Sequence, residues 1–234
     1  MDGVLTADPR LVEDAQPVPF LTFDEATELA YFGATVLHPQ SMQPAMAAAM
    51  PVRVKNSYNP DAAGTLILSE RDLDDELQTS VVRKKSVTKV DIQSTRMLGQ
   101  YGFLAKVFGQ FDQLGISVDV VATSEVSVSL TLDPAKIWHR ELIQQELDNL
   151  VNAFEGIATV RLQREKSIIS LICNVARSSE ILERVFQQLK QREVNVQMIS
   201  QGASKVNISL IVDDAEAKDC IHAIHEAFYG SDAE

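Results

Sequence analysis

Cysteine is scarce in this chain of 234 residues, which contains Cys173 and Cys220 and no CxxC pair. So few thiols exclude a disulfide framework and a cysteine-rich zinc site, and they fit buried side chains in a reducing compartment. Long hydrophobic runs are also missing, since none approaches the roughly 18 to 20 residues that cross a bilayer. We therefore expect neither a redox protein nor a membrane protein.

Positive charge is in deficit as well. The chain has 33 acidic and 21 basic residues, and its formal net charge is -12. Proteins that bind nucleic acids gather positive charge on one face, so no nucleic-acid partner is expected. The one basic cluster, Arg83-Lys84-Lys85, is too short for such a face and is interpreted as a solvated linker.

Side chains with the spacing of a catalytic or metal centre are equally few. His222 and His225 stand three residues apart in a predicted helix, but no further ligand has a suitable spacing, so a surface helix is favoured over a metal pair. No serine lies in the GxSxG frame of a hydrolase. Trp138 follows a predicted helix start and is interpreted as a packing residue. No metal site is predicted.

Residues 1–70 have the pattern of the last part of an α/β domain. A polar turn, "DGVLTADPR", is followed by Thr22 and Glu25 at capping-box spacing, then an amphipathic helix with Gly33 as its stop. "PQSMQPAMAAAMP" predicts a second, packed helix, and "VRVKNSY" and the segment after "NPDAAGT" predict two strands. "SERDLDDELQ" then predicts an exposed acidic connection.

The rest of the chain contains an internal repeat. Residues 103–121 align with 181–199 at an offset of 78, and "SVSLTLD" aligns with the later "NISLIVD". The first copy predicts a βαββαβ, ferredoxin-like module whose second helix is capped by Asp133. The second copy ends without a fourth strand, so its sheet edge needs a donor. Residues 79–85 are the expected donor, which would make the first module an insertion within the second.

The loop "GQYGFL" (99–104) joins a predicted strand to a helix start. Its two glycines let the backbone approach a ligand, and free N–H groups there can receive a carboxylate. Farther along, Asp119 can hold an ammonium group, and hydroxyls are offered by Ser117, Thr123 and Ser124. The two segments together predict a site for a zwitterionic amino acid, and their spacing alone leaves open an ordinary structural turn.

Several long motifs resemble one known family. "DGVLTADPR", "LTFDEATELAYFGATVLHPQSM", "PVRVKNSYNPDAAGTLI" and "ATSEVSVSLTLD" are similar to the C-terminal half of a monofunctional, lysine-sensitive aspartokinase of the plant type. The resemblance implies an α/β fold class, in which a partial amino-acid-kinase α/β domain precedes two intertwined, ferredoxin-like βαββαβ ACT domains. The implied divisions are the C-terminal part of the kinase (ATP-site) domain at 1–70, a linker and strand added to the second ACT sheet at 71–85, the first ACT domain at 86–163 and the second at 164–230.

The resemblance implies aspartate kinase activity, in which the γ-phosphoryl group of ATP, bound with Mg²⁺, is transferred to L-aspartate in the first step toward lysine, threonine and methionine. The implied ATP-binding residues are Asp2, Gly3, Leu5, Arg10, Thr35 and Val36. Many relatives have an aromatic residue at the position of Leu5 and a lysine at that of Thr35. The family's catalytic residues would lie upstream of Met1, so the chain is interpreted as N-terminally truncated and inactive alone.

By the same resemblance, L-lysine is a feedback effector that binds between the first ACT domains of two subunits, and S-adenosylmethionine is a second candidate effector. The implied effector residues are Met97, Gln100, Gly102, Phe103, Leu104, Ser117, Val118, Asp119, Thr123, Ser124 and Glu125. The implied assembly is a homodimer or tetramer through the ACT domains, in the cytoplasm or the plastid stroma. The alternative function is a non-catalytic ACT-domain subunit that binds lysine and pairs with a catalytic aspartokinase chain.

Overall fold

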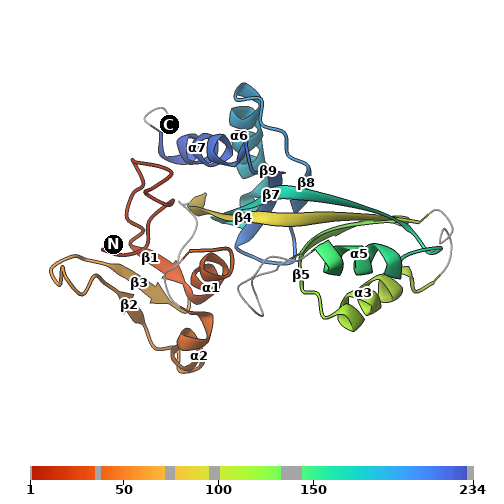
Figure 1. Ribbon diagram of the computed structural model, residues 1–234. Helices are drawn as coiled ribbons and strands as arrows, with labels where there is room; N and C mark the ends of the chain where they lie inside the picture. The colour runs from red at the N-terminus through yellow and green to blue at the C-terminus, as the bar shows by residue number, and fades with distance from the viewer. Residues whose placement is uncertain (1, 35–37, 72–76, 95–100, 133–143, 231–234) are drawn as a thin grey trace. The chain divides into compact units, whose positions relative to one another are not determined.

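The computed structural model describes residues 2–34, 38–71, 77–94, 101–132 and 144–230 (Figure 1). The chain divides into two compact units, one made of residues 1–84 and 167–234 and the other of residues 85–166. Two long strands, β4 (Gln78–Gln93) and β7 (Thr159–Cys173), have residues in both units. Among the described residues, no helix is long and apolar enough to span a membrane.

The amino-terminal part of the first unit is a small α/β layer. Its elements are β1 (Phe20–Thr22), α1 (Phe23–Tyr31), α2 (Pro39–Ala47), β2 (Val52–Val54) and β3 (Thr65–Leu68). The strand order is β1-β3-β2, with β1 parallel and β2 antiparallel to β3. The predicted capping box is present, since Glu25 N–H donates to Thr22 Oγ1 (3.1 Å) and Thr22 N–H donates to Glu25 Oε2 (2.7 Å). The prediction that α2 is packed is only partly right, because Met42 is buried but Met46 is exposed.

A buried ion pair joins α1 to the segment that leads into β4. Arg71 Nε and Nη2 donate to the Glu25 carboxylate at 2.9 and 2.7 Å, and Thr79 Oγ1 donates to it at 2.7 Å. Burial opposes ionisation of Glu25, but the hydrogen bonds from Arg71 and Thr22 outweigh it and lower the pKa of this carboxyl. The connection predicted to be exposed therefore contains a buried arginine. Residues 72–76 of that connection lie outside the described residues.

The rest of the first unit is a ferredoxin-like module, called the second module here, made of residues 78–84 and 167–230. After β7 it contains η2 (Val175–Arg177), α6 (Ser178–Gln191), β8 (Met198–Ser200), β9 (Asn207–Asp213) and α7 (Ala217–Tyr229). The strand order is β4-β7-β9-β8. The carboxyl-terminal copy of the repeat supplies three of these strands, and β4 supplies the fourth, which precedes the other copy in the chain. The predicted fold class of intertwined modules is confirmed.

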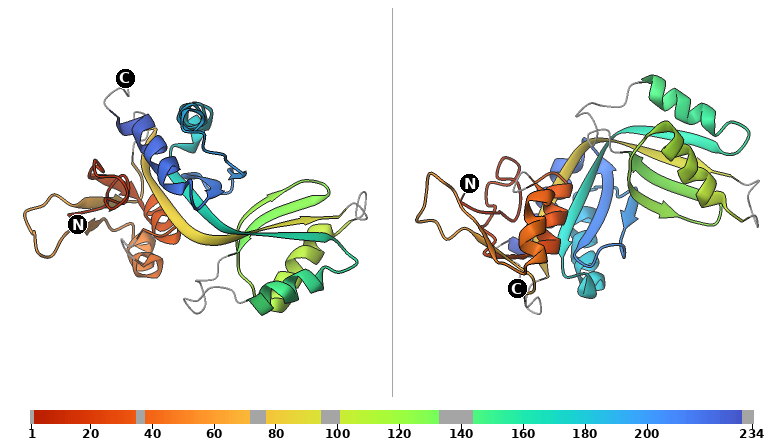
Figure 2. Two further views of the ribbon diagram at one scale, coloured as in Figure 1. Left: turned by 45° about the horizontal axis from the view of Figure 1, so that its top comes forward. Right: turned by 90° about the horizontal axis from the view of Figure 1, so that it is seen from below.

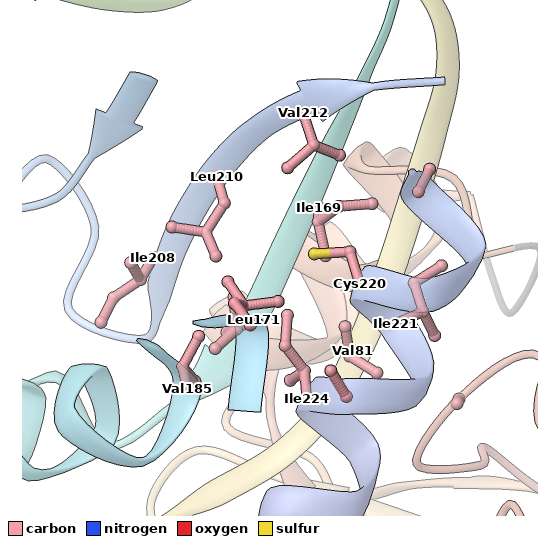
Figure 3. Packing of buried hydrophobic residues seen from close by; sticks show 14 of the residues in the cluster. Val81, Ile169, Leu171, Val185, Ile208, Leu210, Val212, Cys220, Ile221 and Ile224 are labelled. Atoms are coloured by element: carbon pink, nitrogen blue, oxygen red, sulfur yellow. The ribbon is translucent and has the colours of Figure 1, made fainter. Parts of the chain in front are cut away.

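Both faces of the sheet in the second module are buried. Helices α6 and α7 cover one face, where Leu171 and Leu210 lie in a fully buried apolar cluster (Figure 3). Helix α1 lies against the other face (Figure 2), where Ile172 shares a buried cluster with residues of α1. Asn207 Nδ2 of β9 also donates to Glu28 Oε2 of α1 at 3.0 Å. Residues of α1 and of the small α/β layer therefore complete the core of this module.

The basic cluster at 83–85 belongs to β4, so its interpretation as a solvated linker is wrong. Arg83 Nε donates to Ser167 Oγ at 3.1 Å, and Lys84 Nζ lies 5.7 Å from the centroid of the Tyr31 ring. The strand continues through these charges because apolar residues on both sides, including Val81 and Val87, are buried.

The second unit, called the first module here, is the inserted ferredoxin-like repeat (85–166). Between its parts of β4 and β7 it contains α3 (Phe103–Leu114), β5 (Val118–Thr123), β6 (Ser127–Leu132) and α5 (Gln144–Ala153). The strand order is β5-β6-β4-β7, and α3 and α5 pack on one face of it over residues such as Ile92 and Leu130 (Figure 1). Asp133, predicted to cap a helix, and Trp138 lie outside the described residues.

Candidate functional site

The polar turn at the start of the chain forms a closed loop, called the opening loop here (residues 2–18). Val18 N–H donates to the Val4 carbonyl, at 2.8 Å, and closes its base. The hydroxyl of Thr65 on β3 accepts from Val4 N–H (2.8 Å) and donates to the Val18 carbonyl (2.7 Å), which fixes that base to the sheet. A Cβ atom at Gly3 would lie 2.8 Å from Thr65 Oγ1, so this close approach requires glycine.

Asp2, predicted to shape a nucleotide turn, is anchored by two amides. Asn56 Nδ2 and Asn59 Nδ2 donate to its two carboxylate oxygens at 2.9 and 3.0 Å. These hydrogen bonds, from Asn56 first, lower the pKa of Asp2, so its exposed carboxylate stays ionised. Both asparagines come from the segment between β2 and β3. Sequence reasoning missed them, although they stand in the motif "VKNSYNPD", which is part of the family resemblance.

The other predicted ATP-binding residues are distributed around the opening loop. Leu5 is half-buried and forms an isolated bridge with Pro17. Arg10 is exposed, and its Nε and Nη2 donate to the Asp8 carboxylate at 3.0 and 2.7 Å. These side-chain hydrogen bonds hold the pKa of Asp8 below its ordinary value. Thr35 and Val36 lie outside the described residues.

The back of the opening loop is held by the second module. Val81 N–H and Ser80 Oγ of β4 donate to the Thr6 carbonyl at 2.8 and 3.0 Å. Thr6 Oγ1 lies 2.9 Å from Nε2 of His225 on α7. His225 is 5% exposed, so the expectation that it lies on a helix surface is wrong. The sequence contained a signal of this burial, because residue 225 falls four positions after Ile221 and so lies on the apolar stripe of α7.

The predicted effector residues of the helix start lie at the amino-terminal end of α3. Gly102 is the N-cap residue, with a left-handed backbone (φ 83°, ψ 14°) that favours glycine. Phe103 packs in the core and Leu104 is exposed. Lys106 N–H donates to the Gly102 carbonyl at 3.0 Å. Met97 and Gln100 lie outside the described residues.

The predicted effector residues of the later segment lie along the edge strand β5. Val118 pairs with Leu132 and Val121 with Leu130, so two residues of β5 face Thr131 and form a bulge. One of the two is Asp119, which is half-buried, as are its neighbours Ser117 and Val118. The exposed residues at the far end of the strand are Thr123, Ser124 and Glu125.

The structure places Gly102 and Asp119, one from each group of predicted effector residues, at opposite ends of the first module. β4 and β5 both run antiparallel to β6, so the carboxyl ends of β4 and β5 lie at the same end of the sheet. The start of α3 follows β4 and therefore lies near Thr123–Glu125. Helix α3, about 18 Å long from its 12 residues, separates Gly102 from Asp119. One chain does not bring these two residues together around one small ligand.

Other reactive side chains of the described residues have structural surroundings. Cys173 and Cys220 are buried and unbridged, and burial raises the pKa of both thiols to about 12. Asp91 accepts hydrogen bonds from Lys89 Nζ and Gln163 Nε2, on the sheet of the first module. Within the described ranges, no group of three His, Cys, Asp or Glu side chains could hold a metal ion.

Comparison with known proteins gives matches at both ends of the chain. The model of the amino acid kinase family matches residues 1–56, and an ACT domain model matches residues 169–228. Aspartokinase 2, chloroplastic, of Arabidopsis thaliana is 66% identical over 234 residues, which cover 99% of this chain and 43% of that protein. The chain thus spans less than half the length of this relative.

Solved structures extend these matches. Escherichia coli aspartokinase III is 33% identical, with TM-scores of 0.84 for its complex with aspartate and ADP and 0.80 for its complex with lysine and aspartate. The match covers 98% of this chain and about half of that one (51% and 50%). A C-terminal regulatory domain of aspartate kinase from Porphyromonas gingivalis is 31% identical (TM-score 0.53), and the match covers 64% of this chain and 96% of that domain.

Proposed function

The chain belongs to the aspartokinase family, and from this premise we propose that it forms the regulatory half and one edge of the ATP site of a monofunctional, lysine-sensitive aspartate kinase of the plant type. In the proposed reaction the γ-phosphoryl group of ATP, supplied as its magnesium complex, passes to the side-chain carboxylate of L-aspartate. The products are 4-phospho-L-aspartate and ADP, in the first step toward lysine, threonine and methionine. Such a transfer depends on positioning and charge neutralisation.

The observation that carries this proposal is the rigid base of the opening loop. Asp2 is fixed by Asn56 and Asn59, and Gly3 lies against Thr65, so the turn is preorganised for a ligand. The likeness to aspartokinase III, which was solved with aspartate and ADP, supports a nucleotide beside this loop. Arg10 would contact phosphate by exchanging its Asp8 partner for the nucleotide.

L-Lysine is the proposed feedback effector, bound by the first module. Gly102 and Asp119 lie at opposite ends of that module, so a ligand held by both would bind between two copies related by two-fold symmetry. A homodimer is the smallest assembly that completes this site, and a tetramer retains it. The complex of aspartokinase III with lysine supports the choice of effector. S-Adenosylmethionine is proposed as a second effector.

The plastid stroma is the proposed compartment. The chain is 65% to 66% identical to three Arabidopsis aspartokinases that are all named as chloroplastic. Import of the natural protein into isolated chloroplasts is the expected result, and retention outside them would contradict it.

The test of the proposed function joins this chain to the amino-terminal half of Arabidopsis aspartokinase 2 and measures ATP-dependent aspartyl phosphate, trapped with hydroxylamine. We expect the joined protein to phosphorylate aspartate and to be inhibited by lysine, and the 234-residue chain alone to be inactive. A folded, inactive chimera that still binds lysine would favour the non-catalytic regulatory subunit. Robust phosphorylation by the isolated chain would contradict the proposed division of the site.

A further inference from the structure

The hydroxyl of Thr6, in the opening loop, lies within hydrogen-bond distance of two groups. Its oxygen accepts Gln16 N–H at 2.9 Å and lies 2.9 Å from His225 Nε2. Thr6 is 3% exposed, so water does not supply further partners for its hydroxyl. A threonine hydroxyl has one hydrogen, and a neutral imidazole has one acceptor nitrogen. The arrangement that satisfies both groups has Thr6 donating to Nε2 and the ring proton on Nδ1.

The surroundings of His225 favour this neutral ring. Burial lowers the pKa of His225, His222 of α7 lowers it further, and Asp14 of the opening loop opposes the shift. The ring of Tyr229 lies 4.8 Å from that of His225 between centroids. From β4, Thr6 is contacted by Ser80 and Val81, which do not titrate.

The acidic residue next to His225 on α7 is paired with a different element. Glu226, the next residue, forms an ion pair with Arg192, which follows α6. The loop itself is docked on the same core as α7, because Ala7 and Val12 belong to the buried cluster that contains Ile224. The pair of Thr6 and His225 is thus a polar contact beside this apolar cluster, between residues 219 positions apart.

We propose that His225 is a positioning residue for the opening loop. By accepting the Thr6 hydroxyl, it holds the loop in the shape that presents Asp2 and Gly3, and it makes nucleotide affinity depend on the docking of α7. This inference rests on the assignment of the loop to ATP under the proposed function. It extends that function by naming a residue of the last helix that acts on the nucleotide site through Thr6.

Protonation of His225 would release the loop, because Nε2 would become a donor and the Thr6 hydrogen would lose its acceptor. The fold favours the neutral ring, so an unfolded chain binds this proton more readily than the folded one. The contact therefore contributes fully to the stability of the folded chain above the ordinary histidine pKa of about 6.5, and this contribution is lost as the pH falls below it.

Hydrogen exchange of the nucleotide-free chain tests the contact directly. We compare His225→Phe, which keeps an aromatic ring, with His225→Gln, which keeps an acceptor, and use His222→Gln as the control on the same helix. In His225→Phe the amides of Thr6 and Val18 are expected to exchange roughly 10-fold faster, while the core amide of Ile224 is unchanged. His225→Gln should restore protection and remove its dependence on pH.

Two further readouts separate positioning from stability. Thr6→Val should match the loop exchange of His225→Phe, and Thr6→Ser should restore protection. ATP titration of the same variants, each joined to the amino-terminal half of Arabidopsis aspartokinase 2, should give a dissociation constant about 10-fold weaker in His225→Phe than in His222→Gln. Equal acceleration of loop and α7 amides, or a spectrum of ¹⁵N-labelled histidine with the proton on Nε2, would overturn the proposal. Loop exchange that responds as expected, without ATP binding by any variant, would count against the proposed function only.

Discussion

The two ferredoxin-like modules share a strand order and differ in what equivalent positions hold. The repeat offset of 78 places Gln197 of the second module at the position of Asp119 in the first. Gln197 Nε2 donates to Asp213 Oδ2 at 2.7 Å, within its own module. The same offset places Glu180, inside α6, at the position of the left-handed Gly102. The two copies share the fold, but only the first module combines a carboxylate at the strand position (Asp119) with a glycine at the helix start (Gly102).

The second module uses its surfaces for the rest of its own unit. One face of its sheet is covered by α1, and α7 holds the opening loop through His225. Through these contacts the second module packs against α1 and the opening loop. The difference is consistent with the proposed division of roles, in which one copy would recognise the effector and the other would support the nucleotide loop.

The largest effect is expected from removing the buried ion pair between α1 and the segment that leads into β4. Arg71→Met leaves the Glu25 carboxylate buried without its guanidinium partner. Loss of one partner of a buried pair typically lowers the free energy of unfolding by about 3–5 kcal/mol. Arg10→Met is the matched control, because Arg10 pairs with Asp8 at the surface and its loss should leave the free energy of unfolding nearly unchanged. Urea unfolding followed by circular dichroism measures both.

The pH dependence of this variant identifies the cause. In the natural chain the pKa of Glu25 is lowered below its ordinary value of 4.5. The ionised carboxylate therefore adds to the free energy of unfolding above pH 4.5, and this contribution is lost as the pH falls below that value. In Arg71→Met the hydrogen bonds from Thr22 and Thr79 remain, but the guanidinium no longer offsets burial, so the pKa of Glu25 rises relative to that in the natural chain. The stability difference should therefore shrink as the pH falls toward and below 4.5. A difference that stays constant with pH would show that lost packing, and not charge, is responsible.

Features governed by local pattern were predictable from the sequence. The capping box of Thr22 and Glu25 and the helices of the repeat follow from spacing within one or two turns. β1 was missed because its three residues are too few to show alternation. Contacts between distant segments, such as that of Thr6 with His225, leave no short-range signal, and only the apolar stripe of α7 pointed to burial.

The candidate sites were predictable in part for the same reason. The structure has Gly102 at a helix start and Asp119 on a strand, as predicted, and their role in binding a zwitterion stays a prediction. Their placement at opposite ends of the module follows from the parallel direction of β4 and β5 on either side of α3, which the predicted βαβ order implies but the spacing of the two residues does not show. The amides that anchor Asp2 lie 54 and 57 residues farther along the chain, so no short-range pattern links them to it.

A smaller effect sharpens the contrast between the two modules. Asp119→Ala removes the carboxylate proposed to hold the ammonium group of lysine, and a lost charge partner of this kind costs about 2 kcal/mol, or roughly 30-fold in affinity. Gln197→Ala is the control at the equivalent position and should leave the lysine dissociation constant unchanged. Calorimetry of lysine binding to the two variants and to the unchanged chain measures both. A lysine affinity reduced by both variants alike would contradict the assignment of the effector to the first module.

The smallest effect is expected at Gly102, and it tests whether the start of α3 requires a residue in the left-handed conformation. Gly102 has a left-handed conformation, and a Cβ added there would have nothing within 4 Å, so Gly102→Ala meets backbone strain and no clash. That strain is about 1–2 kcal/mol of unfolding free energy. Gly109, in the interior of α3, has equally open space, and Gly109→Ala should instead stabilise by about 0.5–1 kcal/mol because alanine favours a helix. Opposite signs in thermal unfolding of the two variants are expected. Stabilisation by both would show that α3 can begin without the left-handed residue, and the glycine at the helix start would then no longer distinguish the first module from the second.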